Sequence, residues 1–331
     1  MSSWARSFER SLVAMTRMVG ASSTRALARK LMPGVALRAA PPGAGAWMPG
    51  VVVGAAGAMR YRLYRPPGVR FGERLPLMVM LHGCGQDADS FAASTRMNRI
   101  ALRERFLVLY PEQDRLSNVQ GCWNWFDTQN GRAYGEAASI LQAIDQVALL
   151  HPVDKARVAI VGLSAGASMA GLLVTRHPER FQAVVMHSGI PPGTAHSSLS
   201  ALGAMHGRRP TQPLAATPVT METHWPPLLV IHGDADAVVS PHNGQAAVQL
   251  WAHAAGARAS QARRLQRGRR HAMSVTDFMR SGRTVATLVA VHGLAHAWSG
   301  GAPSQAFSDG QGPDASRMAW AFAARQFRSV G

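Results

Sequence analysis

Cysteine, acidic residues and charge in general are scarce in this sequence. There are only two cysteines, Cys84 and Cys122, among 331 residues. That number excludes a disulfide-rich scaffold and a structural zinc site built from thiolates, although the two cysteines could form one bridge. Charged residues make up 16% and hydrophobic residues 47% of the chain, which excludes a disordered protein and provides enough apolar side chains for a large folded domain.

Long apolar runs are also missing. No stretch approaches the roughly 20 apolar residues of a membrane span. In the first 30 residues the longest apolar run is Leu12–Met15, shorter than the core of a secretion signal, so no clear signal peptide is predicted. The same residues are basic, and segment 5–19 has apolar side chains near helical spacing. We favour a poorly ordered tail; a helix giving weak surface association through the basic N-terminus is the alternative.

Negative charge is outnumbered: 35 Lys and Arg against 18 Asp and Glu give a formal net charge of +17. The excess is nearly all arginine, with one cluster between Arg258 and Arg270. No aromatic residues interleave with this cluster, and no zinc-finger or RNA-binding motif is present. We interpret it as a solvated basic surface and expect no nucleic-acid partner. The histidine spacings do not make a metal site, and no metal or cofactor is expected.

Two segments divide the chain. Residues 1–58 are predicted to be a basic N-terminal segment followed, over 31–58, by a Gly-, Ala- and Pro-rich linker; residues 59–331 are predicted to form a single catalytic domain. Within this domain, short apolar runs suited to buried strands alternate with helical patterns. The strands are predicted at Leu77–His82, Phe106–Tyr110, Arg157–Gly162, Ala183–His187, Leu228–His232 and Thr284–His292. The helices are predicted at 88–104, 135–150, 165–176, 244–256 and 314–328.

Strand–helix alternation of this kind predicts an α/β fold with a mostly parallel, twisted sheet and helices on both faces. Residues 191–226 lack periodicity and are predicted to be an inserted loop near the functional site. Residues 271–292 are predicted to form a hairpin that turns at Ser281-Gly282-Arg283.

A sharp turn is predicted at Gly162-Leu163-Ser164-Ala165-Gly166, between a buried strand and a helix rich in small residues. G-x-S-x-G in this context is the nucleophile elbow of α/β-hydrolases, where glycines permit a tight turn and the serine is presented above the sheet. Ser164 is therefore the candidate nucleophile. The helix N-terminus beneath it would stabilise negative charge.

A serine nucleophile needs a base and an acid, which in this fold follow in the order Ser, Asp or Glu, His. The strand Leu228–His232 ends in a loop with Asp234 and Asp236. The usual H-G-x-x-D spacing favours Asp236, and Asp234 would then brace the loop. After the last long strand come His292 and His296; we favour His296, in the loop, over His292 at the strand end.

Two further segments could complete the site. His82-Gly83-Cys84 follows an early strand, so the backbone N–H groups of Cys84 and Ala165 are the predicted oxyanion hole. In 121–126, Trp123, Trp125 and Phe126 suggest a flat hydrophobic platform for substrate, with a packed loop as the alternative. A Cys84–Cys122 bridge would hold this loop against the oxyanion hole.

Together these segments resemble the poly(3-hydroxybutyrate) depolymerase family of esterases, relatives of feruloyl and acetylxylan esterases, over about residues 59–328. The resemblance rests on Leu81–Cys84, Thr95–Asn98, Leu109–Gln113, Cys122–Trp125, Gly162–Gly166, His232–Asp236 and His296–Gly301. It implies the α/β-hydrolase fold, the triad Ser164, Asp236 and His296, and a substrate role for Trp123. It also implies an extracellular or periplasmic location, with the cytoplasm as the alternative because no clear signal peptide is present.

Three functions follow from these features. The first is a serine esterase of the depolymerase type that cleaves short 3-hydroxyacyl esters through an acyl-enzyme. The second is a carboxylesterase of the feruloyl or acetylxylan type that acts on small aryl or acetyl esters. The third is a non-catalytic binding protein on the same scaffold. The sequence leaves the oligomeric state open.

Overall fold

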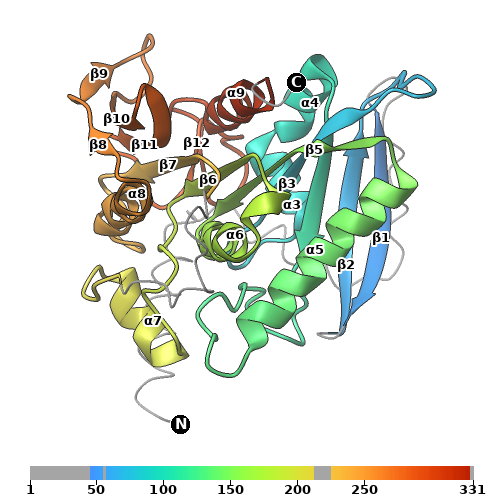
Figure 1. Cartoon of the computed structure of the whole chain (residues 1–331), viewed down its shortest axis with the longest axis horizontal. Coiled ribbons are helices and arrows are strands. Elements are labelled where there is room, and N and C mark those ends of the chain that lie inside the picture. The colour runs from blue at the N-terminus through green and yellow to red at the C-terminus, as the bar shows by residue number, and fades with distance from the viewer. Residues whose placement is uncertain (1–44, 55–56, 212–224, 329–331) are drawn as a thin grey trace. The chain divides into compact units, whose positions relative to one another are not determined.

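An 11-stranded sheet forms the centre of the protein in a computed structural model that describes residues 45–54, 57–211 and 225–328 (Figure 1). The strand order is β1-β2-β4-β3-β5-β6-β7-β11-β10-β8, and β9 also pairs with β10. The run from β4 to β11 is parallel. The strands at the two ends, β1–β2 and β10 with its partners, are antiparallel to their neighbours.

The strands of the main sheet are β1 (Ala46–Gly54), β2 (Gly57–Arg65), β3 (Leu75–Leu81), β4 (Leu107–Glu112), β5 (Val153–Leu163), β6 (Ala183–His187), β7 (Leu228–Gly233), β8 (Arg258–Ala259), β9 (Arg263–Leu265), β10 (Met273–Arg280) and β11 (Arg283–Val291). A small second sheet pairs β12 (Trp298–Ser299) with β13 (Ser308–Asp309). The helices are α3 (Ala88–Thr95), α4 (Met97–Glu104), α5 (Arg132–Leu150), α6 (Ala165–Arg176), α7 (Ser198–Met205), α8 (His242–Ala255) and α9 (Ala315–Phe327), with a 3-10 turn at Pro178–Arg180.

The sheet separates two apolar layers, because successive side chains of a strand point to opposite faces. In β3, Leu77 and Val79 belong to the layer beneath α5, α6 and α8, whereas Met78 and Met80 belong to the layer beneath α3, α4 and α9. Both faces are therefore covered, which explains why the central strands are apolar along their whole length. The predicted α/β class, with a mostly parallel sheet and helices on both faces, is confirmed.

The N-terminal boundary differs from the prediction. The expectation that 31–58 is a linker, with the domain starting at 59, is wrong for 46–54, which form β1 and pair along their whole length with β2. The small residues are used for packing: a Cβ at Gly50 would lie 2.1 Å from Cζ of Tyr61. Trp47 anchors the strand by packing edge-on against Tyr110 at 5.4 Å between ring centroids. The segment 5–19 and the rest of the basic N-terminus lie outside the described residues.

Other segments agree more closely with the prediction. The hairpin at 271–292 is confirmed as β10 and β11, and its turn residues Ser281 and Gly282 have positive φ angles of 48° and 77°. The helix predicted at 88–104 is broken at Arg96, which has a φ of 55° and separates α3 from α4. Within 191–226, residues 198–205 form α7, and 212–224 lie outside the described residues. In the part of the chain that is described, no helix is long and apolar enough to span a bilayer.

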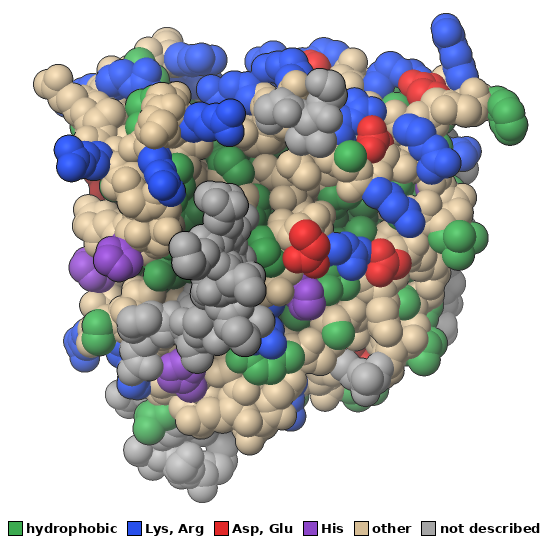
Figure 2. Space-filling model, in the orientation of Figure 1, with side chains coloured by type: hydrophobic (Ala, Val, Ile, Leu, Met, Phe, Trp, Pro, Cys, Tyr) green, Lys and Arg blue, Asp and Glu red, His purple; other side chains and the backbone are tan. Residues whose placement is uncertain are grey.

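The arginine-rich segment 258–270 lies on the edge strands β8 and β9 and the adjoining turns, and each of its residues is exposed. Figure 2 shows Lys and Arg side chains spread along the upper edge of this view, where Figure 1 places β9, α9 and α4. One of these arginines, Arg263, pairs with Asp277 of β10. The segment thus forms a solvated basic surface.

Candidate active site

The turn between β5 and α6 presents Ser164 at the carboxyl edge of the sheet. Its backbone angles, φ 55° and ψ −120°, are strained for a residue with a side chain. The turn requires glycine on both sides: a Cβ at Gly162 would lie 2.2 Å from the carbonyl carbon of Gly166, and a Cβ at Gly166 would lie 2.2 Å from the carbonyl oxygen of Leu81. The turn therefore requires glycine at both 162 and 166.

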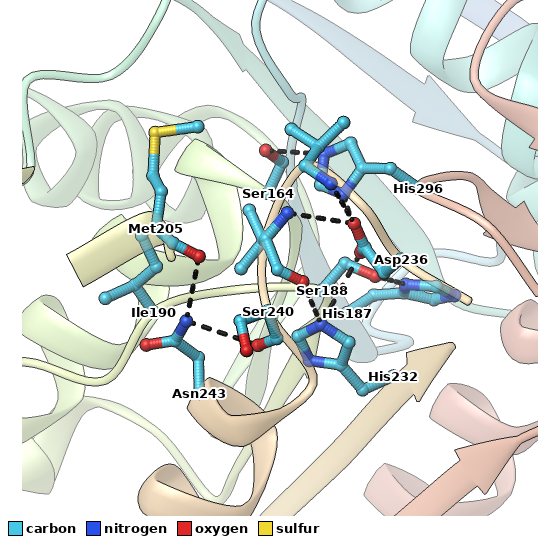
Figure 3. Close-up of polar contacts among 12 residues, drawn as sticks. Ser164, His187, Ser188, Ile190, Met205, His232, Asp236, Ser240, Asn243 and His296 are labelled. Atoms are coloured by element: carbon cyan, nitrogen blue, oxygen red, sulfur yellow. Dashed lines mark hydrogen bonds and ion pairs between the residues drawn. The ribbon is translucent and has the colours of Figure 1, made fainter. Parts of the chain in front are cut away.

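Three predicted side chains meet at this turn (Figure 3). The Ser164 hydroxyl lies 2.9 Å from Nε2 of His296, and Nδ1 of the same imidazole lies 2.8 Å from Oδ2 of Asp236. His296 belongs to the loop between β11 and β12, and Asp236 to the loop after β7. All three residues are buried. The chain of contacts can therefore pass a proton from the hydroxyl to the imidazole, beside a carboxylate that stabilises the cation.

The other oxygen of Asp236 is held by its own loop. Oδ1 accepts hydrogen bonds from the backbone N–H groups of Val238 and Val239, at 3.0 and 2.9 Å. Burial acts to raise the pKa of Asp236, but hydrogen bonds and charge interactions with His232 and His296 outweigh it and hold the pKa far below the usual value. Asp236 is therefore ionised and fixed in orientation.

The alternative acid and base form a separate pair. Oδ2 of Asp234 lies 2.9 Å from Nδ1 of His292, and Oδ1 accepts a hydrogen bond from Gly293 N–H at 2.7 Å. His292 is held on its other side by the Ser274 hydroxyl. This pair does not contact Ser164. The Asp234–His292 contact instead connects the loop that carries Asp236 to the loop that carries His296.

The loop that carries His296 is fastened by residues for which the sequence suggested no role. The guanidinium of Arg96 donates hydrogen bonds to the carbonyl oxygens of Gly300 and Gly301. The ring of Trp298 is fully buried and stacks on His187, with 5.0 Å between the ring centroids. Arg96 is the left-handed residue between α3 and α4. The break in the helix therefore places the Arg96 side chain where it reaches this loop. A mid-helix break leaves no simple signal in sequence.

The predicted oxyanion donors lie on the two sides of the nucleophile. Ala165 N–H is at the start of α6, and the His82-Gly83-Cys84 segment passes close by, since a Cβ at Gly83 would be 3.5 Å from Cβ of Ser164. The amide of Gly83 is already bonded to Gln86. Among the described residues, neither Cys84 N–H nor Ala165 N–H has a hydrogen-bond acceptor. Both are free to bind an oxyanion.

Cys84 and Cys122 form a disulfide that ties the oxyanion segment to the loop 118–126. A second connection lies beside it, where Nε1 of Trp123 donates to the carbonyl oxygen of His82 at 3.1 Å. The aromatic loop is therefore fixed against the segment after β3 that carries the predicted oxyanion donor.

The expected aromatic platform is wrong. Trp123 has no exposed surface and Trp125 is 8% exposed, so their rings are part of the core, as in the packed-loop alternative. The loop is held from beneath by the buried carboxylate of Glu136, which accepts hydrogen bonds from the backbone of Asn124 at 2.8 Å and from Gln113 at 2.7 Å. Burial raises the pKa of Glu136 despite these donors. Trp123 supports the site and does not form a binding surface.

No metal site accompanies these residues. Within the described ranges, no group of three or more His, Cys, Asp or Glu side chains is placed to hold a metal ion.

A mostly parallel sheet with a serine at the turn after β5, and with an aspartate and a histidine in the loops after β7 and β11, defines the α/β-hydrolase class. The chain belongs to the esterase PHB depolymerase family, whose match covers residues 59–287.

Known relatives agree with this membership. Poly(3-hydroxyalkanoate) depolymerase C of Paucimonas lemoignei is 32% identical over 183 residues, which are 53% of this chain and 44% of that protein. Feruloyl esterase B of Neurospora crassa is 26% identical over 59% of this chain and 70% of its own length. The chain thus spans less than half of the depolymerase. Among solved structures, an acetyl xylan esterase from Aspergillus awamori has the same fold, with a TM-score of 0.61, 18% identity and coverage of 75% of this chain and 94% of that one.

Replacing Cys122 by alanine should destabilise the protein and expose one thiol. The bridge closes a loop with a sequence separation of 38. Loop-closure entropy for that length predicts a loss of about 4 kcal/mol in the free energy of unfolding, measured by urea denaturation without reductant. The matched control is the double variant Cys84→Ala/Cys122→Ala, which should be no more stable than Cys122→Ala. If the unsubstituted protein, unfolded without reductant, shows two titratable thiols, the Cys84–Cys122 bridge is absent.

Acid should destabilise the fold through two buried histidines, His82 and His187. Burial, with nearby positive charge, lowers the pKa of His187 to about 3, and burial lowers the pKa of His82 to about 4. Both histidines titrate near 6.5 when unfolded, so unfolding takes up two protons between pH 6.5 and about 4. Stability should be fully present above pH 6.5 and fall by about 2 to 3 kcal/mol per pH unit in this window.

Urea denaturation at a series of pH values measures that slope. His82→Gln and His187→Gln should each remove about half of it. A slope that is unchanged in both variants would show that these two rings are not the source.

Proposed function

We propose that this protein is a serine esterase that hydrolyses carboxylic esters through an acyl-enzyme. The observation that carries the proposal is the continuous chain of contacts from Ser164 through His296 to Asp236, with 2.9 Å and 2.8 Å between successive partners. Membership of the esterase family over residues 59–287 supports the same conclusion. An intact chain of this kind argues against a non-catalytic binding protein.

The geometry gives each group a step. His296 takes the proton from the Ser164 hydroxyl as the oxygen attacks the ester carbonyl, and Asp236 stabilises the resulting imidazolium. The amides of Cys84 and Ala165 bind the negative oxygen of the tetrahedral intermediate. The imidazolium then protonates the departing alcohol. Water, deprotonated by the same imidazole, cleaves the acyl-enzyme and restores the serine.

For the substrate we propose short 3-hydroxyacyl esters, including oligomeric hydroxyalkanoates. The support is the 32% identity to a protein named poly(3-hydroxyalkanoate) depolymerase C. Small aryl or acetyl esters are the second candidate, supported by lower identities of 26% and 27% to proteins named feruloyl esterase B and probable acetylxylan esterase A. We further propose an extracellular or periplasmic location, because a disulfide between Cys84 and Cys122 persists in oxidising compartments.

The variant Ser164→Ala should lose p-nitrophenyl butyrate hydrolysis by a factor of at least about 10³, since removing the nucleophile leaves only binding and the oxyanion hole. Its unfolding curve should match that of the native protein. The control is Ser168→Ala, one turn further along α6, where the hydroxyl bonds to backbone and not to His296. Native-level hydrolysis by the Ser164→Ala protein would refute the assignment.

A comparison of substrates should separate the two candidate classes. We expect kcat/KM for soluble 3-hydroxybutyrate oligomers to exceed that for methyl ferulate and acetylated xylose by about tenfold or more, because pocket contacts that differ by one or two groups are worth about 1 to 3 kcal/mol. Equal or reversed values, measured with the same enzyme preparation, would favour the second class.

A further inference from the structure

A second imidazole lies behind the carboxylate of Asp236. Nε2 of His232, the next-to-last residue of β7, is 3.5 Å from Oδ2 of Asp236, the same oxygen that contacts His296. The same nitrogen is 2.9 Å from the carbonyl oxygen of Val239. His232 is 2% exposed, and its ring belongs to the cluster drawn in Figure 3. None of the steps assigned above uses it.

The surroundings fix the tautomer of this ring. Both neighbours of Nε2 are acceptors, so Nε2 must carry the proton and donate. Nδ1 is then a bare acceptor, and among the described residues no donor reaches it although it is buried. A buried acceptor without a partner destabilises the fold by about 1 to 3 kcal/mol. The useful contacts of this ring are therefore those made by Nε2, with Asp236 and Val239.

His232 acts on Asp236 in two ways. Its N–H contacts Oδ2 directly, and through Val239 it anchors the turn whose amides hold Oδ1. The ring has room only because residue 244, at the start of α8, is glycine: a Cβ there would lie 2.9 Å from Nδ1 of His232. A line of contacts therefore runs from Gly244 through His232 and Asp236 to His296.

We propose that His232 is a positioning residue that holds the Asp236 carboxylate in line with His296. The inference rests on the proposed esterase function and adds to it a residue that touches neither substrate nor nucleophile. The titratable groups facing Asp236 are His232 on β7, His187 on β6 and His296 in the loop before β12, whereas Asp234 is engaged by His292. His187 is held by Ser188 and by the amide of Ser299. His232 is thus the one of these side chains that can hold the carboxylate from behind.

Substitution His232→Leu should lower kcat on p-nitrophenyl butyrate by about 10- to 100-fold with KM unchanged, because small misplacement of a catalytic group has effects of that size. A misaligned Asp236 no longer stabilises the His296 cation, so the acid limb of the kcat/KM profile should move to lower pH. His232→Gln, which keeps an N–H donor, should recover part of kcat and of the shift.

Gly244→Ala tests the same line of contacts without changing any polar group. Alanine suits a helix better than glycine, but the added Cβ overpacks a buried ring, so we expect stability to fall by about 1 to 3 kcal/mol. The added Cβ should displace the His232 ring and reduce kcat in the same direction as His232→Leu. The control is His253→Leu on the exposed face of the same helix, which should leave kcat and the pH profile as in the native enzyme.

The proton NMR signal of the His296 Nδ1–H, shared with Asp236, provides a readout that needs no substrate. It should shift or broaden in His232→Leu and Gly244→Ala and stay in place in His253→Leu. An unchanged signal together with an unchanged acid limb, or an acid limb that moves to higher pH, would overturn the positioning role. If the native protein lacks esterase activity but the signal changes as expected, the proposed function fails while the positioning role stands.

Discussion

The turn at residues 162–166 is possible only because its first and last residues have no side chains. A Cβ at Gly162 would lie 2.2 Å from the backbone of Gly166 in the same turn, and a Cβ at Gly166 would lie 2.2 Å from the carbonyl oxygen of Leu81 at the end of β3. With that space left empty, α6 starts directly at the end of β5, and Ser164 takes a strained φ of 55° that directs its hydroxyl away from the sheet. The close approach of α6 to the end of β3 follows from the same constraint, and it brings the Cys84 segment beside the serine. The proposed oxyanion donors and the proposed nucleophile are therefore brought together where α6 packs against the end of β3.

The parallel sheet supplies the remaining groups. Because β5, β6, β7 and β11 are consecutive neighbours and run in the same direction, the loops after them open at one edge. Asp236 follows β7 and His296 follows β11, so two residues 60 positions apart meet within 2.8 Å. Groups that do not react lie around this arrangement: His187 stacks on Trp298, the half-buried Arg96 donates to the glycine carbonyls, and His232 lies behind Asp236. The hydrogen bonds at the centre of the site are thus shielded from water. Electrostatic interactions between charges and dipoles are stronger there than in bulk water.

Much of this could be predicted from sequence because the strongest signals are local. The apolar strand before Ser164, the glycines around it and the order of Asp236 and His296 are short patterns with a direct physical meaning. The sequence does not reveal β1, because its two glycines and its proline are typical of linkers, whereas in the fold Gly50 makes room for the ring of Tyr61. Three aromatics within four residues suggest a surface at Trp123 and Trp125, and the sequence does not show that the buried carboxylate of Glu136, on the following helix α5, holds their loop in the core. Arg96, His187 and His232 act through tertiary contacts, which no pattern along the chain reveals.

Covalent labelling tests the central claim, an activated serine at the β5–α6 turn, most directly. The native protein is treated with a fluorophosphonate, and intact mass followed by peptide mapping locates the adduct. We expect one adduct per chain, on Ser164, because only this hydroxyl is placed to pass its proton to His296. No adduct, or an adduct on another residue such as Ser188 with Ser164 unmodified, would contradict it.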